Sequence, residues 1–250
     1  MNPVKVIIPI YKERLSANEA LSLRHNMKVL GNHPLVLLVP ASFSMERFLQ
    51  ATPPLDASYE VMRVPDEWLG TKCGIAGYNR MMLSEKFYAR FSDCEYILIC
   101  HVDAWVFRDE LAAWCAKGYD CVGGIWWRRG IWALPIIGRL FPPNRRLYHR
   151  IGNGGFSLRR VAAFRDYCVQ ARERIEYYLR HDHHIYNEDV FWAVEPAHFR
   201  YPSREEANAF SFDNHPDRCM TLAGGRLPFA CHGWLKAARI GFWRAYIPQN

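Results

Sequence analysis

The chain has 250 residues, of which 50% are hydrophobic and 14% aromatic, so it can bury a substantial core, and its charged fraction of 23% excludes long disordered segments. Lysine and arginine exceed aspartate and glutamate by 32 − 25 = 7, which favours anionic partners such as nucleotide phosphates or an acidic lipid surface. We expect no nucleic-acid partner, because the sequence has neither a basic recognition helix nor an aromatic RNA-binding strand.

The first half of the chain alternates predicted strands and helices. Apolar, β-branched runs predict strands over 4–10, 35–39, 59–64 and 96–100, and the intervening patterns predict helices over 16–30, 43–50 and 73–91. Ser16, followed three residues later by Glu19, has the capping-box pattern that marks a helix start. This alternation predicts an α/β fold with a mostly parallel central sheet flanked by helices.

The second half is less regular. Glycine, proline, tryptophan and arginine crowd together over 123–146, which is typical of a functional loop or lid, and helical periodicity returns over 158–180. We interpret the chain as one domain, with a nucleotide-binding half over 1–123 and an acceptor and catalytic half over 124–250. The run 234–246 suits either an interfacial amphipathic helix or an ordinary docked helix.

The eight cysteines include no C-x-x-C pair, and several lie in apolar runs, so we expect reduced, buried thiols. The N-terminal residues turn polar too early for a signal peptide, and no apolar run approaches the ~20 residues that a membrane span needs. We therefore expect a cytoplasmic protein, with peripheral contact to the inner face of a membrane left open.

Two short motifs lie where an α/β sheet collects ligands. Asp103 follows the predicted strand 96–100, and ligands bind at the carboxyl ends of such strands, so Asp103 is either a turn residue or a metal ligand. Three glycines within 152–155 indicate a close backbone approach, either to another strand or to a sugar and phosphate.

Further polar candidates follow toward the C-terminus. Glu188 and Asp189 precede an apolar helical stretch, as first-turn acids do, or include a general base. His232 is either structural or a metal ligand that complements Asp103. The histidine-rich segment 181–184 lacks helical metal-site spacing, so it is either a solvated loop or part of an acceptor site. Trp126, Trp127 and Trp132 favour a sugar-binding surface over core packing alone.

Taken in this order, the motifs resemble the GT-A-fold nucleotide-sugar glycosyltransferases, especially the β-galactosyltransferases, and a bacterial family of glycosyltransferase-like proteins, over roughly 4–234. The resemblance implies a metal-dependent, inverting enzyme that moves a sugar from a nucleotide-diphosphate sugar, with a UDP-sugar favoured, to a hydroxyl group. The basic, aromatic second half of the chain favours a bacterial surface glycan or a lipid-linked glycan as the acceptor. Carboxylate, imidazole and phosphate ligands suit Mn²⁺ better than Mg²⁺.

The resemblance also implies roles for individual residues. The donor site would comprise Pro9 and Tyr11, Asn79 and Arg80 of the Tyr78-Asn79-Arg80 segment, His101 and Asp103, and Gly154 and Gly155. Asp103 and His232 would be the metal ligands, Asp189 the catalytic base, and Glu188 a residue that orients the base or the acceptor. Trp126 and Trp127 are the expected acceptor-binding residues. His101 departs from the family, which has an acid at this position of its D-x-D motif.

Two other classes stay open from the sequence. One is a different nucleotide-sugar enzyme, such as a retaining transferase or a nucleotidyltransferase, although the absence of glycine over 9–14 disfavours the latter. The other is a non-catalytic carbohydrate-binding protein on the same fold.

Overall fold

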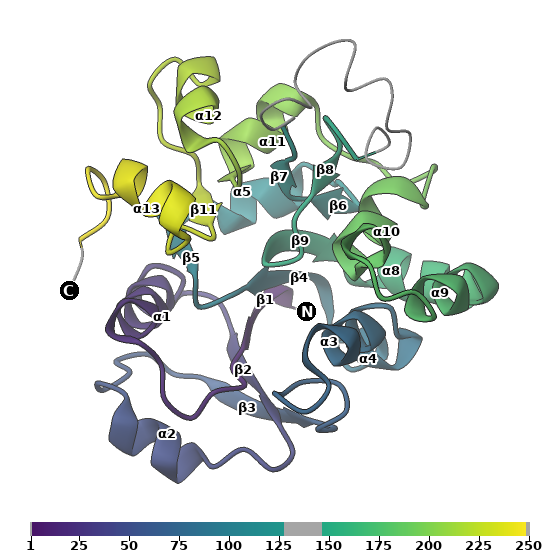
Figure 1. Cartoon of the computed structure of the whole chain (residues 1–250), viewed down its shortest axis with the longest axis horizontal. Coiled ribbons are helices and arrows are strands. Elements are labelled where there is room, and N and C mark those ends of the chain that lie inside the picture. Colours follow the sequence, from purple (N-terminus) through teal and green to yellow (C-terminus); the bar gives the residue numbers. More distant parts are fainter. Residues whose placement is uncertain (1, 128–146, 249–250) are drawn as a thin grey trace.

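A six-stranded sheet with helices on both faces forms the centre of the computed structural model, which describes residues 2–127 and 147–248 (Figure 1). Its strand order is β3 (Glu60–Val64), β2 (Leu35–Pro40), β1 (Asn2–Pro9), β4 (Cys94–Cys100), β9 (Phe156–Arg160) and β6 (Cys121–Val122). The first four strands are parallel, and β9 is antiparallel to both of its neighbours. The predicted α/β fold with a mostly parallel central sheet is confirmed.

Alternating side chains of the buried strands fill two apolar layers. Val6 and Ile8 of β1 face one layer, which is covered by α1 (Ala17–Val29), α2 (Met45–Ala51) and α5 (Leu111–Ala116). Ile7 faces the other, which is covered by α3 (Gly74–Met82), α4 (Glu85–Ala89), α8 (Val161–Gln170), α9 (Arg172–Leu179) and α10 (Glu188–Val194). Because both faces are covered, these strands are apolar at almost every position.

The early elements lie where the sequence predicts them, within one or two residues. At the start of α1, the Glu19 amide donates to Ser16 Oγ and the Ser16 amide donates to Glu19 Oε2 at 2.8 Å. This pair is the predicted capping box, and it satisfies two amide groups that a helix start leaves unpaired.

The predicted helix 73–91 is wrong, because the structure breaks it into α3 and α4. The backbone is extended at Ser84. The Met82 carbonyl group accepts hydrogen bonds from the Tyr88 hydroxyl at 2.8 Å and from Trp192 Nε1 at 3.2 Å. Side chains thereby supply the bonds that a continuous helix would have made along its own backbone. The sequence pattern shows no proline or glycine at this break.

The predicted helix 158–180 is also wrong in part. Its first residues belong to strand β9, which pairs with β4 from Tyr96 to Cys100, and the helical part is divided at Ala171. Strand pairing with two neighbours outweighs the local helical pattern here. Of the irregular segment 123–146, residues 128–146, including Trp132, lie outside the described residues.

The chain after residue 100 adds a smaller layer beside the main sheet. Its three-stranded sheet has the order β10 (Ser211–Phe212), β11 (Ala230–His232) and β5 (Ala104–Val106), and β7 (Gly124–Ile125) pairs with β8 (Ile151–Gly152). The remaining described elements are the 3-10 helix η2 (His184–Tyr186) and the helices α11 (Arg204–Phe210), α12 (Pro216–Leu222) and α13 (Ala237–Trp243).

The C-terminal run is a docked helix. Trp234 and Trp243 are fully buried, and Trp234 Nε1 donates to Ser22 Oγ of α1 at 2.9 Å. Both side chains are therefore committed to the interior instead of to an interface with lipid. Every helix in the described part of the chain is too short or too polar to cross a bilayer. The thiols are free, and all except the half-buried Cys73 are buried, as predicted.

One buried amide ties α1 to strand β5. The Asn26 side chain is 2% exposed, donates to the Ala104 carbonyl group at 2.8 Å and accepts from the Val106 amide at 2.9 Å. It thus pairs backbone groups of β5 on the edge that faces α1. Asp103, a candidate site residue, directly precedes this strand.

We predict that Asn26→Ala lowers the free energy of unfolding by about 2–4 kcal/mol, because two buried backbone groups lose their partners. Urea denaturation followed by circular dichroism measures this change. Lys28→Ala, an exposed change on the same helix, should alter it by less than about 0.5 kcal/mol. Equal effects of the two substitutions would contradict the role given to Asn26.

Candidate functional site

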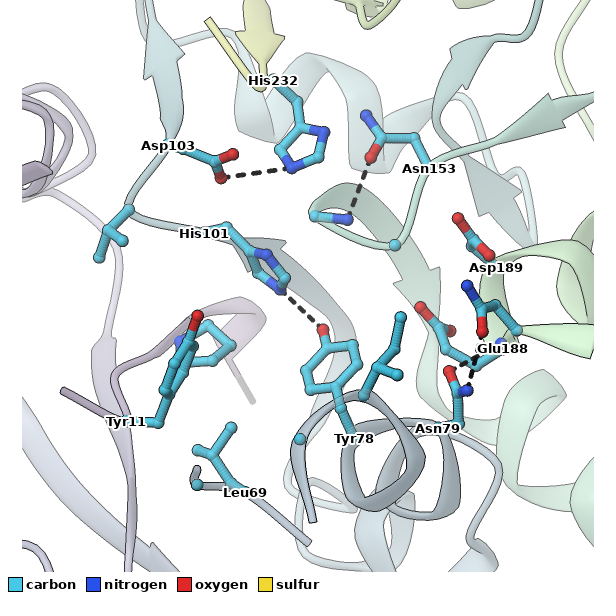
Figure 2. A pocket seen from close by; sticks show the side chains of 18 of the residues that line it. Tyr11, Leu69, Tyr78, Asn79, His101, Asp103, Asn153, Glu188, Asp189 and His232 are labelled. Atoms are coloured by element: carbon cyan, nitrogen blue, oxygen red, sulfur yellow. Dashed lines mark hydrogen bonds and ion pairs between the residues drawn. The ribbon is translucent and has the colours of Figure 1, made fainter. Parts of the chain in front are cut away.

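A cavity of about 680 Å³ opens at the carboxyl ends of β1 and β4. Chain order reverses between these two strands, because β2 lies on one side of β1 and β4 on the other, and such a switch point leaves a crevice for ligands. The cavity brings together residues that the sequence singles out, namely Pro9, Tyr11, Asn79, His101, Asp103, Gly154, Gly155, Glu188, Asp189 and His232. They come from segments spread along the chain between Pro9 and His232, and Figure 2 shows most of them.

Backbone pairing places His232 beside Asp103. Strand β11 runs antiparallel to β5 with His232 opposite Ala104, and the Gly233 amide donates to the Asp103 carbonyl group at 2.9 Å. The His101 amide donates in turn to the Gly155 carbonyl group at 2.9 Å. Backbone pairing in the two sheets therefore fixes the relative positions of Asp103 and His232, and of His101 and Gly155.

His101, Asp103 and His232 form a group that could hold a metal ion, with one ligand atom from each lying within 4.8 Å of the others. Asp103 Oδ1 is 3.3 Å from His232 Nε2, and His101 Nε2 is 2.8 Å from the Tyr78 hydroxyl (Figure 2). Within residues 2–127 and 147–248, it is the only cluster of this kind. One carboxylate and two imidazoles are a donor set that suits a divalent transition metal.

Two residues that the sequence did not single out support His232 on the side of the ring away from Asp103. Asp213 Oδ1 lies 3.3 Å from His232 Nδ1, and Arg239 Nη1 donates to Asp213 Oδ1 at 3.0 Å and to the His232 carbonyl group at 3.1 Å. A carboxylate on the second ring nitrogen is the usual support of a metal-binding histidine. Both residues are more than nine-tenths buried, a rare state for charged side chains and one that no sequence pattern reveals.

The charges in this group are strongly coupled. Burial alone would lower the pKa of His232, but Asp103 and Asp213 outweigh it and raise the pKa to about 9. Burial opposes ionisation of Asp103 and Asp213 too, yet His232 lowers the pKa of both, that of Asp213 to about 2. Burial lowers the pKa of His101 to about 4, so its ring is neutral at pH 7. A proton on His232 Nε2, beside Asp103, thus occupies the place that a metal cation would take, whereas Asp213 faces the other ring nitrogen.

Glycines are required where two of these side chains approach the backbone. A Cβ atom at Gly155 would lie 2.0 Å from His232 Nε2, and one at Gly154 would lie 2.0 Å from Glu188 Oε1. Any side chain at either position would displace a residue of the site. The sequence-based expectation of a close approach is confirmed, and the neighbours are the side chains of His232 and Glu188.

A second pair of acids lies in another part of the cavity, in the first turn of α10 (Figure 2). Glu188 is 3% exposed and accepts from Arg159 Nη2 at 3.1 Å, and Arg159 is itself 2% exposed. Burial raises the pKa of Glu188 against the effect of Arg159. Burial, followed by the charge of Glu188, raises the pKa of Asp189 to about 7. Glu188 is thus committed to Arg159, whereas Asp189 is a carboxyl group that can exchange a proton near neutrality.

Asn79 contributes to the site mainly by fixing α10. Its Oδ1 accepts from the Glu188 amide at 3.0 Å, and its Nδ2 donates to Asn187 Oδ1 at 3.1 Å. The side chain therefore joins α3 to the start of α10, although it also lines the cavity.

Three of the expected residues do not line the cavity. Arg80 is exposed, because one further step around α3 from Asn79 turns its side chain toward solvent. Trp126 packs partly buried against the apolar layer of the main sheet, and Trp127 is 7% exposed and lines a separate cavity. The segment 181–184 is exposed and also lies outside the cavity lining.

Residues 58–232 match a protein family described as "Protein of unknown function (DUF5672)". The chain belongs to this family. None of the curated protein sequences compared with the chain is similar to it.

Solved structures establish the type of fold. The galactosyltransferase LgtC, in complex with donor and acceptor sugar analogues, superposes with a TM-score of 0.54 and 12% identity, covering 91% of this chain and 86% of its own. An active-site mutant of LgtC gives the same TM-score and coverage at 13% identity. Core-mannan synthase A from Aspergillus fumigatus, in a Mn/GDP form, gives 0.49 at 11% identity over 77% and 69% of the two chains. The similarity to LgtC confirms the predicted GT-A glycosyltransferase fold.

We predict that Gly155→Ala weakens Mn²⁺ binding at least about tenfold, because the added methyl group displaces His232 from the candidate metal group. Isothermal titration of the purified protein with MnCl₂ measures this affinity. Gly241→Ala is the matched control, since a Cβ atom there meets nothing within 4 Å. Unchanged Mn²⁺ affinity in a folded Gly155→Ala protein would remove His232 from the metal site.

Proposed function

We propose that the chain is a metal-dependent, inverting glycosyltransferase that moves a sugar from a nucleotide-diphosphate sugar to a hydroxyl group of a glycan or lipid-linked glycan. The observation that carries the proposal is the division of one cavity into a metal-competent group and a separate carboxyl group with a pKa near neutrality. The GT-A fold supports it, because LgtC, which shares that fold, holds donor and acceptor sugar analogues.

The metal would be held by Asp103, His232 and His101. Imidazole ligands beside a carboxylate favour Mn²⁺ over Mg²⁺, which prefers oxygen ligands. When bound, the cation neutralises charge on the leaving diphosphate. Asp213 fixes the orientation of His232 from the opposite ring nitrogen. Lys236, which is exposed and lines the same cavity, adds a positive charge where the phosphates would lie.

The rest of the cavity suits a nucleotide sugar. Tyr11 is 44% exposed and, together with Pro9, offers a flat face for the base, and we favour uracil there. Asn153 lines the cavity, and its buried Nδ2 has no hydrogen-bond partner among the described residues. A sugar hydroxyl group would satisfy that donor. In this scheme 1–123 supplies most of the nucleotide site, and 124–250 supplies the base and the acceptor side.

Asp189 is the proposed catalytic base. The acceptor oxygen forms a bond to the anomeric carbon, the bond from that carbon to the phosphate oxygen breaks, and the nucleoside diphosphate leaves with the electron pair. Asp189 takes the proton of the attacking hydroxyl group. Glu188 is held by Arg159, and its charge helps to raise the pKa of Asp189. Attack from the side opposite the diphosphate inverts the anomeric centre, so the product would have the opposite configuration to the donor.

A panel of nucleotide sugars with and without Mn²⁺, scored by thermal shift and by nucleotide release, tests the proposal directly. We expect one donor, with UDP-sugars favoured, to stabilise the protein only with Mn²⁺, and Asp103→Ala to abolish that shift. Asp56→Ala, which removes a largely exposed carboxylate elsewhere, is the control and should leave the shift unchanged. A complete absence of metal-dependent donor binding and hydrolysis would instead favour a non-catalytic carbohydrate-binding protein.

We predict that Asp189→Asn keeps donor binding but slows transfer roughly 10²–10⁴-fold, because an amide cannot accept the acceptor proton. Thermal shift measures binding, and nucleotide release in the presence of acceptor measures turnover. Near-normal turnover in this variant would remove Asp189 as the base.

The pH profile supplies the control for that substitution. A base works only when deprotonated, so kcat/KM of the wild-type protein should rise as pH increases through about 7, the raised pKa of Asp189. The residual activity of Asp189→Asn should lack this rise. NMR of the product reports its anomeric configuration, and retention would replace the inverting mechanism with a retaining one.

A further inference from the structure

A second cavity, of about 710 Å³, lies among the β5–α5 connection, α11 and α12. Four arginines line it, Arg108, Arg204, Arg218 and Arg226, against a single carboxylate among the described lining residues, Glu205. Cavities of this size hold small organic ligands. The two cavities share none of their described lining residues, so the two sites are separate.

Three of these arginines are free to bind an anion. Arg204, Arg218 and Arg226 are exposed and make no ion pair with any residue in the part of the chain that the structure describes. Arg108 is occupied, since it pairs with Glu110 and its Nη1 donates to the Leu227 and Pro228 carbonyl groups at 3.1 and 2.9 Å. Arg226 makes one backbone contact, from Nε to the Ala223 carbonyl group at 3.3 Å, and no ion pair among the described residues. Like charges gathered without ion-pair partners repel one another, so an anionic ligand would relieve that cost.

One lining residue, Trp127, holds an arginine in place. The guanidinium group of Arg218 lies 4.4 Å from the centre of the Trp127 ring, a cation–π contact that limits its freedom. Trp127 is itself fixed, because its Nε1 donates to Cys219 Sγ at 3.2 Å and its amide donates to Asn214 Oδ1 at 3.1 Å. A preorganised guanidinium loses less entropy when it binds a ligand.

The same cavity offers acceptors for hydroxyl groups. Asn208 is 5% exposed, and its buried Oδ1 has no hydrogen-bond partner within residues 2–127 and 147–248, while its Nδ2 donates to the Cys219 carbonyl group. Glu205 adds a carboxylate with two further acceptor oxygens. A bare phosphate dianion donates no hydrogen bond to such groups, whereas a sugar carries several hydroxyl donors. Leu222 and Leu227 supply apolar surface for ring C–H groups.

We propose that this cavity is a second ligand site that binds an anionic saccharide, a sugar carrying carboxylate or phosphate groups, through Arg204, Arg218 and Arg226. If the ligand is part of the glycan acceptor, that identification rests on the proposed transferase function, but the binding of an anion rests on this cavity alone. Trp127, expected from the sequence to bind the acceptor, would then act by holding Arg218 in position.

Titration calorimetry in metal-free buffer tests the site, with trigalacturonate as the anionic probe and maltotriose as a neutral sugar of the same length. We expect trigalacturonate to bind at least about tenfold more tightly, and added NaCl to weaken its binding. The double substitution Arg218→Gln/Arg226→Gln should weaken it about 100-fold, roughly tenfold for each charge-assisted contact that is lost. Equal affinity for the two sugars would overturn the proposal.

A matched control removes the same charge elsewhere. Arg165→Gln/Arg172→Gln changes the partly exposed Arg165 of α8 and the exposed Arg172 of α9, neither of which lines the cavity, and should leave trigalacturonate affinity within about twofold of wild type. A comparable loss in this control would show that net charge, not the cavity, drives binding, and would overturn the proposal. Glucuronate and glucose 6-phosphate, titrated separately, identify whether carboxylate or phosphate is preferred.

The test separates this site from the proposed function. Asp103→Ala should abolish metal-dependent donor binding while leaving trigalacturonate binding intact, because Asp103 does not line this cavity. Failure of every nucleotide-sugar donor would contradict the transferase proposal and leave the anionic-saccharide site standing. Loss of trigalacturonate binding in Asp103→Ala would instead show that the probe occupies the first cavity, and would overturn this inference.

Discussion

The antiparallel pairing of β11 with β5 is the constraint on which the candidate site depends. It sets His232 opposite Ala104, one residue from Asp103, so that two groups more than 120 residues apart in the chain face each other. Their charges then need support, because isolated buried charges are costly. Asp213 and Arg239 provide it and complete a buried chain of alternating charge that leads from the cavity into the interior.

Pairing of buried charges also determines the properties of the second acidic pair, Glu188 and Asp189. Arg159 and Glu188 are both almost fully buried and compensate each other, whereas Asp189 beside them makes no ion pair with any described residue. Removing either member of such a pair leaves the other as an unpaired buried charge. Glu188 is thereby paired with a cation, while burial and the charge of Glu188 raise the pKa of Asp189 to about 7. Two adjacent acids of similar intrinsic chemistry acquire different properties from their surroundings alone.

The two cavities are joined through one short segment of chain. Asp213 supports His232 in the first cavity, and the next residue, Asn214, binds the backbone of Trp127, whose ring positions Arg218 in the second. The residues that directly follow strand β10 thus position side chains in both cavities, His232 in the first and Trp127 in the second. This arrangement accounts for two of the buried polar residues there, since Asp213 pairs with charged groups and Asn214 with the backbone of a neighbouring element.

The sequence by itself determined the α/β fold, most strand positions, the capping box of α1 and the need for glycine at Gly154 and Gly155, because these follow from local periodicity, hydrogen-bonding residues and backbone sterics. The resemblance to GT-A transferases pointed further, to Asp103, Asp189 and His232, which the fold does bring into one cavity. Only the tertiary structure decided the break between α3 and α4, the outward position of Arg80, and the buried partners Asp213, Arg239 and Arg159. Those features depend on contacts between residues distant in the chain, and a local pattern holds no information about which distant group will supply a hydrogen bond or a charge.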